Sequence, residues 1–265
     1  MTDASGRTLL FFAVDIAAGT RFKETAPAGH GWLPAFETFF KELPLVVMGQ
    51  VGLAFAEADD VPEIGIWKAL GDELIFRAEP RNVEEAALLT EACYRGLVAY
   101  DARLSSRWPL RLRGCVWAAR FPERNIEIAL REIASDGPGV HVDYLGPDID
   151  LGFRLSSQPH HGQMAISMNL AEAIADTAER RGMRFHYVGK RLLKGVFMGR
   201  PYPLILATFE DCMPDPWEWE REEREELMAV RDRPPTPAAD LVAFVARIRS
   251  YLNRTTALDL KKLEF

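Results

Sequence analysis

Residues 66–75 read IWKALGDELI, a run of strand-forming residues interrupted by a Gly-Asp step at 71–72. Strand composition on both sides of such a step predicts a β-hairpin. The tip also carries two opposite charges, Lys68 and Asp72, within an otherwise apolar run. Either both side chains face solvent at an ordinary turn, or one or both hold a charged ligand.

Strand and helix patterns alternate along the rest of the sequence. The apolar run within residues 7–22 predicts a buried strand that ends at Asp15, followed by a small-residue loop. Because a hairpin occurs among the alternating elements, the pattern favours an α+β fold with a mixed, mostly antiparallel sheet flanked by helices. Helices are predicted at 32–43, 82–104 (with Asn82 as N-cap) and 171–182, and further strands at 110–121, within 139–157 before a helix start, and at 163–170, 184–196 and 201–210.

Composition bounds the class of protein. The chain has 265 residues, 48% of them hydrophobic and 27% charged, and a net charge of −7, which disfavours binding to nucleic acid. No apolar run approaches the roughly 18 residues of a membrane helix, and the run near the N-terminus is too short for a signal peptide. Three separated cysteines, at positions 93, 115 and 212, form neither a disulfide framework nor a zinc motif. These features predict a cytoplasmic protein with no membrane partner.

The character of the sequence changes near residue 211. The stretch WEWEREEREEL predicts an acidic helix, RDRPPTPAAD a proline-rich hinge, and residues 241–252 an amphipathic helix. We therefore expect residues 1–211 to form one domain and residues 212–265 a helical extension, packed either on that domain or on a partner chain.

Charged residues occupy several positions that a pure core would avoid. Asp150 and Arg154 lie four residues apart, a spacing that also suits a surface ion pair worth less than about 1 kcal/mol. Asp72 also suits an ordinary turn. Asp15 is harder to explain in this way, because a carboxylate at the end of a buried strand needs a cation or hydrogen-bond donors.

Taken together and in order, these motifs resemble the catalytic domain of the class III nucleotidyl cyclases. FAVDIAAGT resembles the segment that supplies the first metal-binding aspartate, here Asp15, with Thr20 five residues later. KALGD resembles the hairpin that supplies a base-contacting lysine and the second metal-binding aspartate, here Lys68 and Asp72. DYLGPDIDLGFR and LLKGV resemble the later motifs, which place Asp143 at the base-reading position, Arg154 at the transition-state arginine and Lys194 at the triphosphate-binding lysine.

The resemblance implies a palm-type, ferredoxin-like cyclase domain. It implies two divalent cations per site, Mn²⁺ or Mg²⁺, held by Asp15 and Asp72 together with Ile16, and a substrate-binding loop that includes Gly19 and Thr20. It also implies a homodimer with two composite sites, because in the family the metal-binding aspartates come from one subunit and the base, arginine and lysine contacts from the other. The reaction implied is attack of the ribose 3′ oxygen of a nucleoside triphosphate on its α-phosphorus, with release of pyrophosphate.

Three positions depart from the family pattern. Asp150 stands at the usual asparagine of the transition-state pair, so an ionised side chain there accepts but cannot donate a hydrogen bond. The glycine of the first loop lies one residue late, at Gly19, and Trp117 stands where a small motif with histidine is usual.

The base of the substrate is left open by the motifs. Lys68 and Asp143 form the adenine-reading combination of the family, which favours ATP. The GPDID and GKRLLKGV stretches are instead similar to the bacterial pyrimidine cyclases of antiphage defence, whose cyclic UMP or CMP activates a separate effector protein. Bulky residues (Ile66, Trp67 and Trp117) would help to fill a pocket for the smaller pyrimidine. We take uridylate cyclase as the leading interpretation. Adenylate cyclase and a degenerate nucleotide-sensing or dimerisation module are the alternatives. A diguanylate cyclase is disfavoured because LGDELIF matches only part of its hairpin motif.

Overall fold

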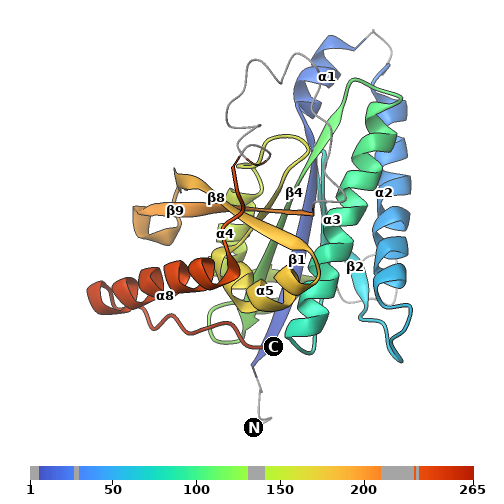
Figure 1. Ribbon diagram of the computed structural model, residues 1–265. Helices are drawn as coiled ribbons and strands as arrows, with labels where there is room; N and C mark the ends of the chain where they lie inside the picture. Colours follow the sequence, from blue (N-terminus) through green and yellow to red (C-terminus); the bar gives the residue numbers. More distant parts are fainter. Residues whose placement is uncertain (1–5, 27–29, 131–140, 210–229, 231–232) are drawn as a thin grey trace.

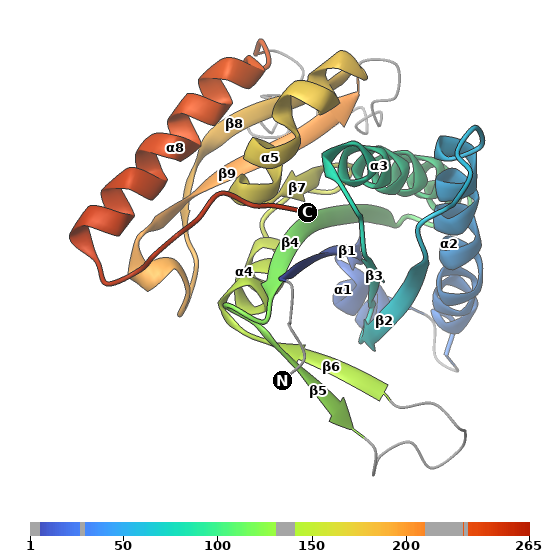
Figure 2. The ribbon, with the colours of Figure 1, turned by 90° about the horizontal axis from the view of Figure 1, so that it is seen from below.

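A computed structural model describes residues 6–26, 30–130, 141–209, 230 and 233–265. A seven-stranded sheet with the order β2-β3-β1-β4-β7-β9-β8 forms its centre, and β5 and β6 form a separate two-stranded sheet (Figures 1 and 2). Neighbouring strands of the large sheet are antiparallel except for β4 and β7, which run parallel. The strands are β1 (Arg7–Ala17), β2 (Ile64–Leu70), β3 (Glu73–Ala78), β4 (Arg111–Phe121), β5 (Ile126–Leu130), β6 (His141–Leu145), β7 (Met164–Ile166), β8 (Met183–Leu192) and β9 (Pro201–Phe209).

Helices cover both faces of the large sheet. Three of them, α2, α3 and α5, lie on one face and α4 lies on the other, as the view from below shows (Figure 2). This mixed α+β arrangement is the one predicted from the sequence. The helices are α1 (Gly19–Thr25), α2 (Leu33–Ala54), α3 (Val83–Ser105), α4 (Pro147–Leu155), α5 (Met168–Arg180), the short 3₁₀ helix η1 (Phe197–Gly199) and α8 (Ala238–Thr255).

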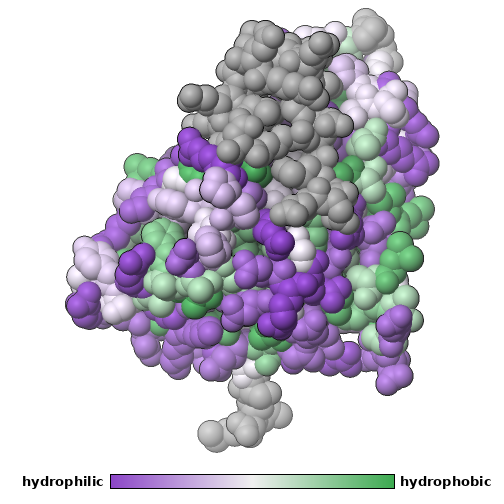
Figure 3. All heavy atoms as spheres, viewed as in Figure 1, coloured by the Kyte–Doolittle hydropathy of each residue, from purple (hydrophilic) through white to green (hydrophobic). Residues whose placement is uncertain are grey.

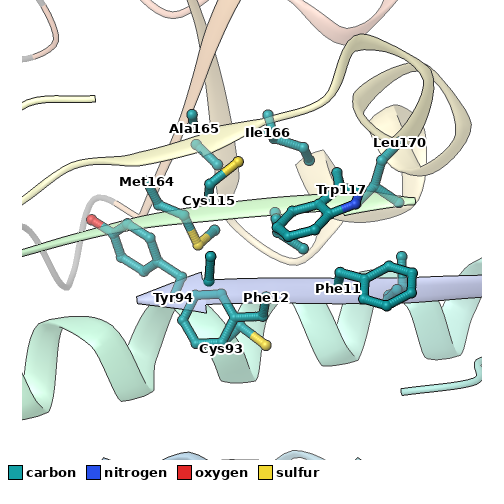
Figure 4. Close-up of a cluster of buried hydrophobic side chains, with 14 of the residues drawn as sticks. Phe11, Phe12, Cys93, Tyr94, Cys115, Trp117, Met164, Ala165, Ile166 and Leu170 are labelled. Atoms are coloured by element: carbon teal, nitrogen blue, oxygen red, sulfur yellow. The ribbon is translucent and has the colours of Figure 1, made fainter. Parts of the chain in front are cut away.

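The core follows from the alternation of side chains along β1 and β4. Phe12 of β1 and its register partner Val116 of β4 lie with Cys93 of α3 on one face of the sheet, and Figure 4 shows Phe12 beside Cys93. Phe11 points to the opposite face and stacks on Trp117, with ring centroids 5.4 Å apart. Trp117 is fully buried, and a Cβ on Gly152 of α4 would lie only 2.1 Å from its indole ring. The glycine therefore permits α4 to lie directly on the sheet.

Most predicted elements are present, with different limits. The helix predicted at 32–43 continues to Ala54 in spite of Pro44, because Val47 and Val51 are buried on the side that faces α3. Asn82 caps α3 as expected, since its side chain accepts a hydrogen bond from the Glu85 amide at 2.9 Å. The strand predicted at 163–170 is too long, because α5 begins at residue 168, and the loop predicted after β1 contains helix α1. Strand β5 was not predicted.

The outer face of α2 remains apolar. Leu45 and Leu53 are each 70% exposed there, and Met48 lies between them. The space-filling view shows this apolar strip at the right edge, over α2 (Figure 3). The described helices include none that is long and apolar enough to cross a membrane.

The C-terminal part of the chain packs on the body of the protein. Helix α8 lies against α5, where Arg249 forms an ion pair with Glu172 that uses both carboxylate oxygens. The tail then returns toward β1, where the Thr8 hydroxyl donates to the carbonyl of Glu264 (Figure 1). The amphipathic helix predicted at 241–252 is thus present and slightly longer, whereas the predicted acidic helix lies outside the described residues.

Candidate active site

The tip of the β2–β3 hairpin meets the end of β1. In the sheet register Asp15 lies opposite Glu73 of β3 on one side and opposite Arg113 of β4 on the other. The Ile16 amide donates to the Asp72 carbonyl at 3.2 Å, which fixes the turn against β1. We call Asp15, Asp72 and Glu73 the acidic cluster. Its members come from separate segments of the sequence, and the antiparallel pairing of β1 with β3 brings them together.

Asp15 is held by one arginine. The Nε and Nη2 atoms of Arg113 lie 2.7 and 2.6 Å from Asp15 Oδ2, and the Asp15 side chain is 15% exposed. Burial raises the pKa of the Asp15 carboxyl; the Arg113 guanidinium opposes this shift, and the nearby charge of Asp72 adds to it. The two aspartates are therefore close enough to repel each other in a partly buried site.

The Asp72 carboxylate lies directly against Gly19. A Cβ built on Gly19, the first residue of α1, would lie 2.0 Å from Asp72 Oδ2. Lys23, one turn further along α1, places its Nζ 3.8 Å from the same oxygen. A side chain at position 19 would therefore displace the Asp72 carboxylate.

The acidic cluster suits a hard divalent cation. Its donors are carboxylate oxygens, and like-charge repulsion between Asp15 and Asp72 is relieved when a cation binds between them. The described residues contain no group of three or more metal-ligating side chains arranged for a metal ion.

Two further predicted residues, Lys68 of β2 and Asp143 of β6, lie side by side. Lys68 Nζ lies 2.6 and 2.8 Å from the two carboxylate oxygens of Asp143. The ammonium also lies 4.7 Å from the centre of the Trp67 ring. The structure thus brings together the two residues that the resemblance assigned to base reading, although 75 positions separate them in the sequence.

Three further predicted residues lie around α4 and the β8–β9 connection. Asp150 and Arg154 are both exposed on α4, and Lys194 is exposed two residues after the end of β8. Thr20 is exposed on α1, next to Gly19. No hydrogen bond or ion pair joins Asp150 to Arg154 in the described part of the chain, so the simple surface pair considered above is not formed there.

The resemblance assigns the predicted residues to two half-sites. One consists of Asp15 and Asp72 with the neighbouring α1 loop; the other consists of Lys68, Asp143, Asp150, Arg154 and Lys194. Within residues 6–26, 30–130, 141–209 and 233–265, no ion pair joins a carboxylate of the first half-site to a cation of the second.

Sequence reasoning missed the cations that neutralise the acidic cluster. Arg113 pairs with Asp15, and its Nη1 also donates to the Ser157 carbonyl at 3.2 Å. An arginine inside an otherwise buried strand requires a partner, and this was the available signal. Glu73 was also missed; burial raises the pKa of its carboxyl, a hydrogen bond with Ser156 lowers it, and the charge of Asp15 raises it again.

Two of the bulky residues considered for a base pocket do not line one. Trp117 has no exposed surface, because α4 covers it through Gly152. Trp67 is 7% exposed and packs against Phe11 and Tyr144. Ile66 is 49% exposed on β2, so of the three it alone presents a substantial surface.

Solved structures share this architecture. The adenylyl cyclase CyaB from P. aeruginosa matches with a TM-score of 0.58 and 16% identity, over 77% of this chain and 95% of that one. The chain has the nucleotidyl cyclase fold. The guanylate cyclase domain of RhGC from Catenaria anguillulae, in complex with GTP, matches with a TM-score of 0.54 and 11% identity, over 78% of this chain and 99% of that domain.

The cyclase fold accounts for most of the chain. The guanylyl cyclase Cya2 also matches, with a TM-score of 0.53 and 14% identity, over 81% of this chain and 96% of that one. The matched cyclases are thus covered almost completely, while about a fifth of this chain lies outside each match. No protein-family model and no curated protein matches the sequence.

Proposed function

We propose that this chain is a nucleotidyl cyclase whose catalytic domain spans residues 1–211. The observation that carries the proposal is the convergence of Asp15 and Asp72 beside Gly19, within the cyclase fold. Two carboxylates held close together at a partly buried site cost stability, and cation binding gives a physical reason for keeping them.

The reaction joins the ribose 3′ oxygen to the α-phosphorus and releases pyrophosphate. Asp15 and Asp72 would hold divalent cations, which would activate the 3′ hydroxyl and neutralise the phosphates. The chain's own residues bind and orient the substrate, which is most of what catalysis of phosphoryl transfer requires. Arg154 would stabilise charge on the α-phosphate, and Lys194 would hold the terminal phosphates. Asp150 would accept a hydrogen bond from a ribose hydroxyl.

Arg113 and Lys23 have a place in this scheme. Both lie beside the acidic cluster, at 2.6 Å from Asp15 and 3.8 Å from Asp72. They neutralise the aspartates before a cation binds. With cations held at the acidic cluster, both side chains would be available to contact the substrate phosphates.

The active form in this proposal is a homodimer, because the resemblance assigns the two half-sites to different protomers. A two-fold dimer would place Asp15 and Asp72 of one protomer opposite Arg154 and Lys194 of its partner, which gives two equivalent sites. A monomer would carry the residues of both half-sites but would contain no complete active site. The complementation experiment in the Discussion addresses this arrangement.

For the base we propose uracil, so that the product is cyclic UMP, a messenger that activates a separate effector in antiphage defence. The similarity of the 146–150 and 189–196 segments to pyrimidine cyclases supports this choice. The candidate base-reading pair is Lys68 with Asp143, whose charged atoms lie 2.6 Å apart. Adenine is the second candidate, because the same lysine–aspartate pair is the adenine-reading combination of the family.

Incubating the purified protein separately with UTP, CTP, ATP and GTP in the presence of Mn²⁺ tests the proposal. We expect pyrophosphate and a 3′,5′-cyclic monophosphate, with UTP converted fastest, and no product from an Asp72→Asn variant that keeps the wild-type melting temperature. Conversion of ATP alone would show that the protein is an adenylate cyclase and not a uridylate cyclase. Nucleotide binding without turnover under all four conditions would contradict the enzyme and favour a sensing module.

A further inference from the structure

A pocket of about 380 Å³ lies where the C-terminal tail meets the cyclase fold. Its walls come from the start of α4, the start of α5, the β8–β9 connection and the tail, the last through Leu258 and Leu260. The volume falls within the range of about 300–1,000 Å³ that is usual for small-molecule sites. Asp15, Asp72, Lys68 and Asp143 are not among its walls, whereas Asp150 of the second half-site is.

The tail wall is fixed in place by specific contacts. The side chain of Asn253 both donates to the Leu260 carbonyl at 3.0 Å and accepts from the Leu260 amide at 2.9 Å. Beyond it, Glu264 pairs with Arg120 at 3.3 Å. The tail is thus anchored on both sides of the pocket, and the space beneath it is not the result of a loose chain end.

The opposite wall is strained. Phe197 and Met198, both of which line the pocket, have φ angles of 52° and 54°, in the left-handed region that non-glycine residues rarely adopt. Such strained residues cluster at ligand clamps and switch segments. Favourable packing of a ligand against these two side chains would offset the strain.

The polar groups of the pocket define the ligand. Arg124 and Asp148 also line it, but they form an ion pair with each other at 3.3 Å. Asp150 is the remaining formal charge of the lining, and no hydrogen bond or ion pair to its side chain is formed within the described ranges. Most of the other walls are apolar, and Met168 and Met198 can adapt to the shape of a guest.

We infer that this pocket binds a small amphipathic amine, with its apolar body against the tail and the β8–β9 connection and its ammonium group on Asp150. The binding site is inferred from the pocket alone and does not depend on the proposed function. A further consequence rests on the proposed function: because Asp150 and the residue after Lys194 share the pocket, an occupant would also change the rate of cyclisation.

Three matched probes test the site: 4-phenylbutylamine, 4-phenylbutanol and 4-phenylbutyrate. Their affinities are measured by ligand-observed NMR on the full chain without nucleotide, so that a failure here leaves the cyclase proposal untouched. We expect saturable binding of the amine, about tenfold tighter than the acid, as a hydrogen bond to a charged group implies. Asp150→Asn should remove the preference for the amine and keep binding of the alcohol.

Leu260→Ser and Leu258→Ser should each weaken all three probes. Leu53→Ser is the matched control, since this leucine is 70% exposed on α2, away from the pocket, and the variant should bind as the wild type does. Melting temperatures confirm that each variant is folded. Absence of saturable binding, equal affinity for amine and acid in the wild type, or full binding by both folded tail variants would overturn the inference.

Discussion

Mixing an Asp15→Ala chain with an Arg154→Ala chain is expected to restore cyclase activity that neither chain has alone. In a composite site the acidic cluster of one protomer acts with Arg154 of the other, so a heterodimer of the two variants contains one intact site. If chains exchange at random, half of the dimers are heterodimers and each has one of two sites, which gives about a quarter of the wild-type rate. Product formation after mixing and subunit exchange measures the effect.

A second mixture supplies the control. Asp15 and Asp72 belong to the same half-site, so Asp15→Ala mixed with Asp72→Ala leaves every composite site without one of its aspartates. No activity should return in that mixture. Equal recovery in both mixtures, or recovery in neither when each variant is folded and dimeric, would contradict the assignment of the two half-sites to different protomers.

Gly19→Ala is expected to disable the acidic cluster without unfolding the protein. The new Cβ would lie 2.0 Å from Asp72 Oδ2 and 3.0 Å from Asp72 Cγ, so the carboxylate must move away from its present position. We expect a loss of about 10- to 100-fold in Mn²⁺ affinity, as for other changes that displace a metal ligand, and a similar loss of activity. Mn²⁺ titration followed by electron paramagnetic resonance measures the affinity directly.

Gly49→Ala is the matched control for this change. Gly49 lies inside α2, where an added Cβ would meet nothing within 4 Å. The substitution should leave Mn²⁺ affinity and turnover unchanged and raise stability by up to about 1 kcal/mol through helix propensity. Wild-type Mn²⁺ affinity in a folded Gly19→Ala chain would show that Asp72 is not a metal ligand.

Local signals in the sequence predicted much of the fold. The Gly-Asp step at 71–72 gave the hairpin between β2 and β3, and Asn82 with its following glutamates gave the start of α3. These features depend on turn geometry and on capping, which act over a few residues. The lengths of the helices and strands were harder to predict. A proline ordinarily ends a helix, and α2 continues past Pro44 because its buried side chains pack toward α3, a contact with a distant segment.

In the candidate site, too, local motifs could be predicted and contacts between distant segments could not. The pairing of Lys68 with Asp143 brings together two residues that the motifs singled out, and the roles of the half-site residues stay a prediction. The partner of Asp15 could not be predicted, because Arg113 reaches it only through the register between β1 and β4. The pocket at the tail could not be predicted from the sequence either. The contact of Asn253 with Leu260 and the position of the tail near α4 are set by tertiary packing.

Anomalous diffraction from crystals grown with Mn²⁺ and a UTP analogue that resists cyclisation tests the central claim most directly. The account predicts Mn²⁺ within coordinating distance of carboxylate oxygens from both Asp15 and Asp72 of one protomer, with the triphosphate reaching Arg154 of the other. Manganese bound elsewhere, or a fully occupied nucleotide whose phosphates lie away from both aspartates, would contradict it.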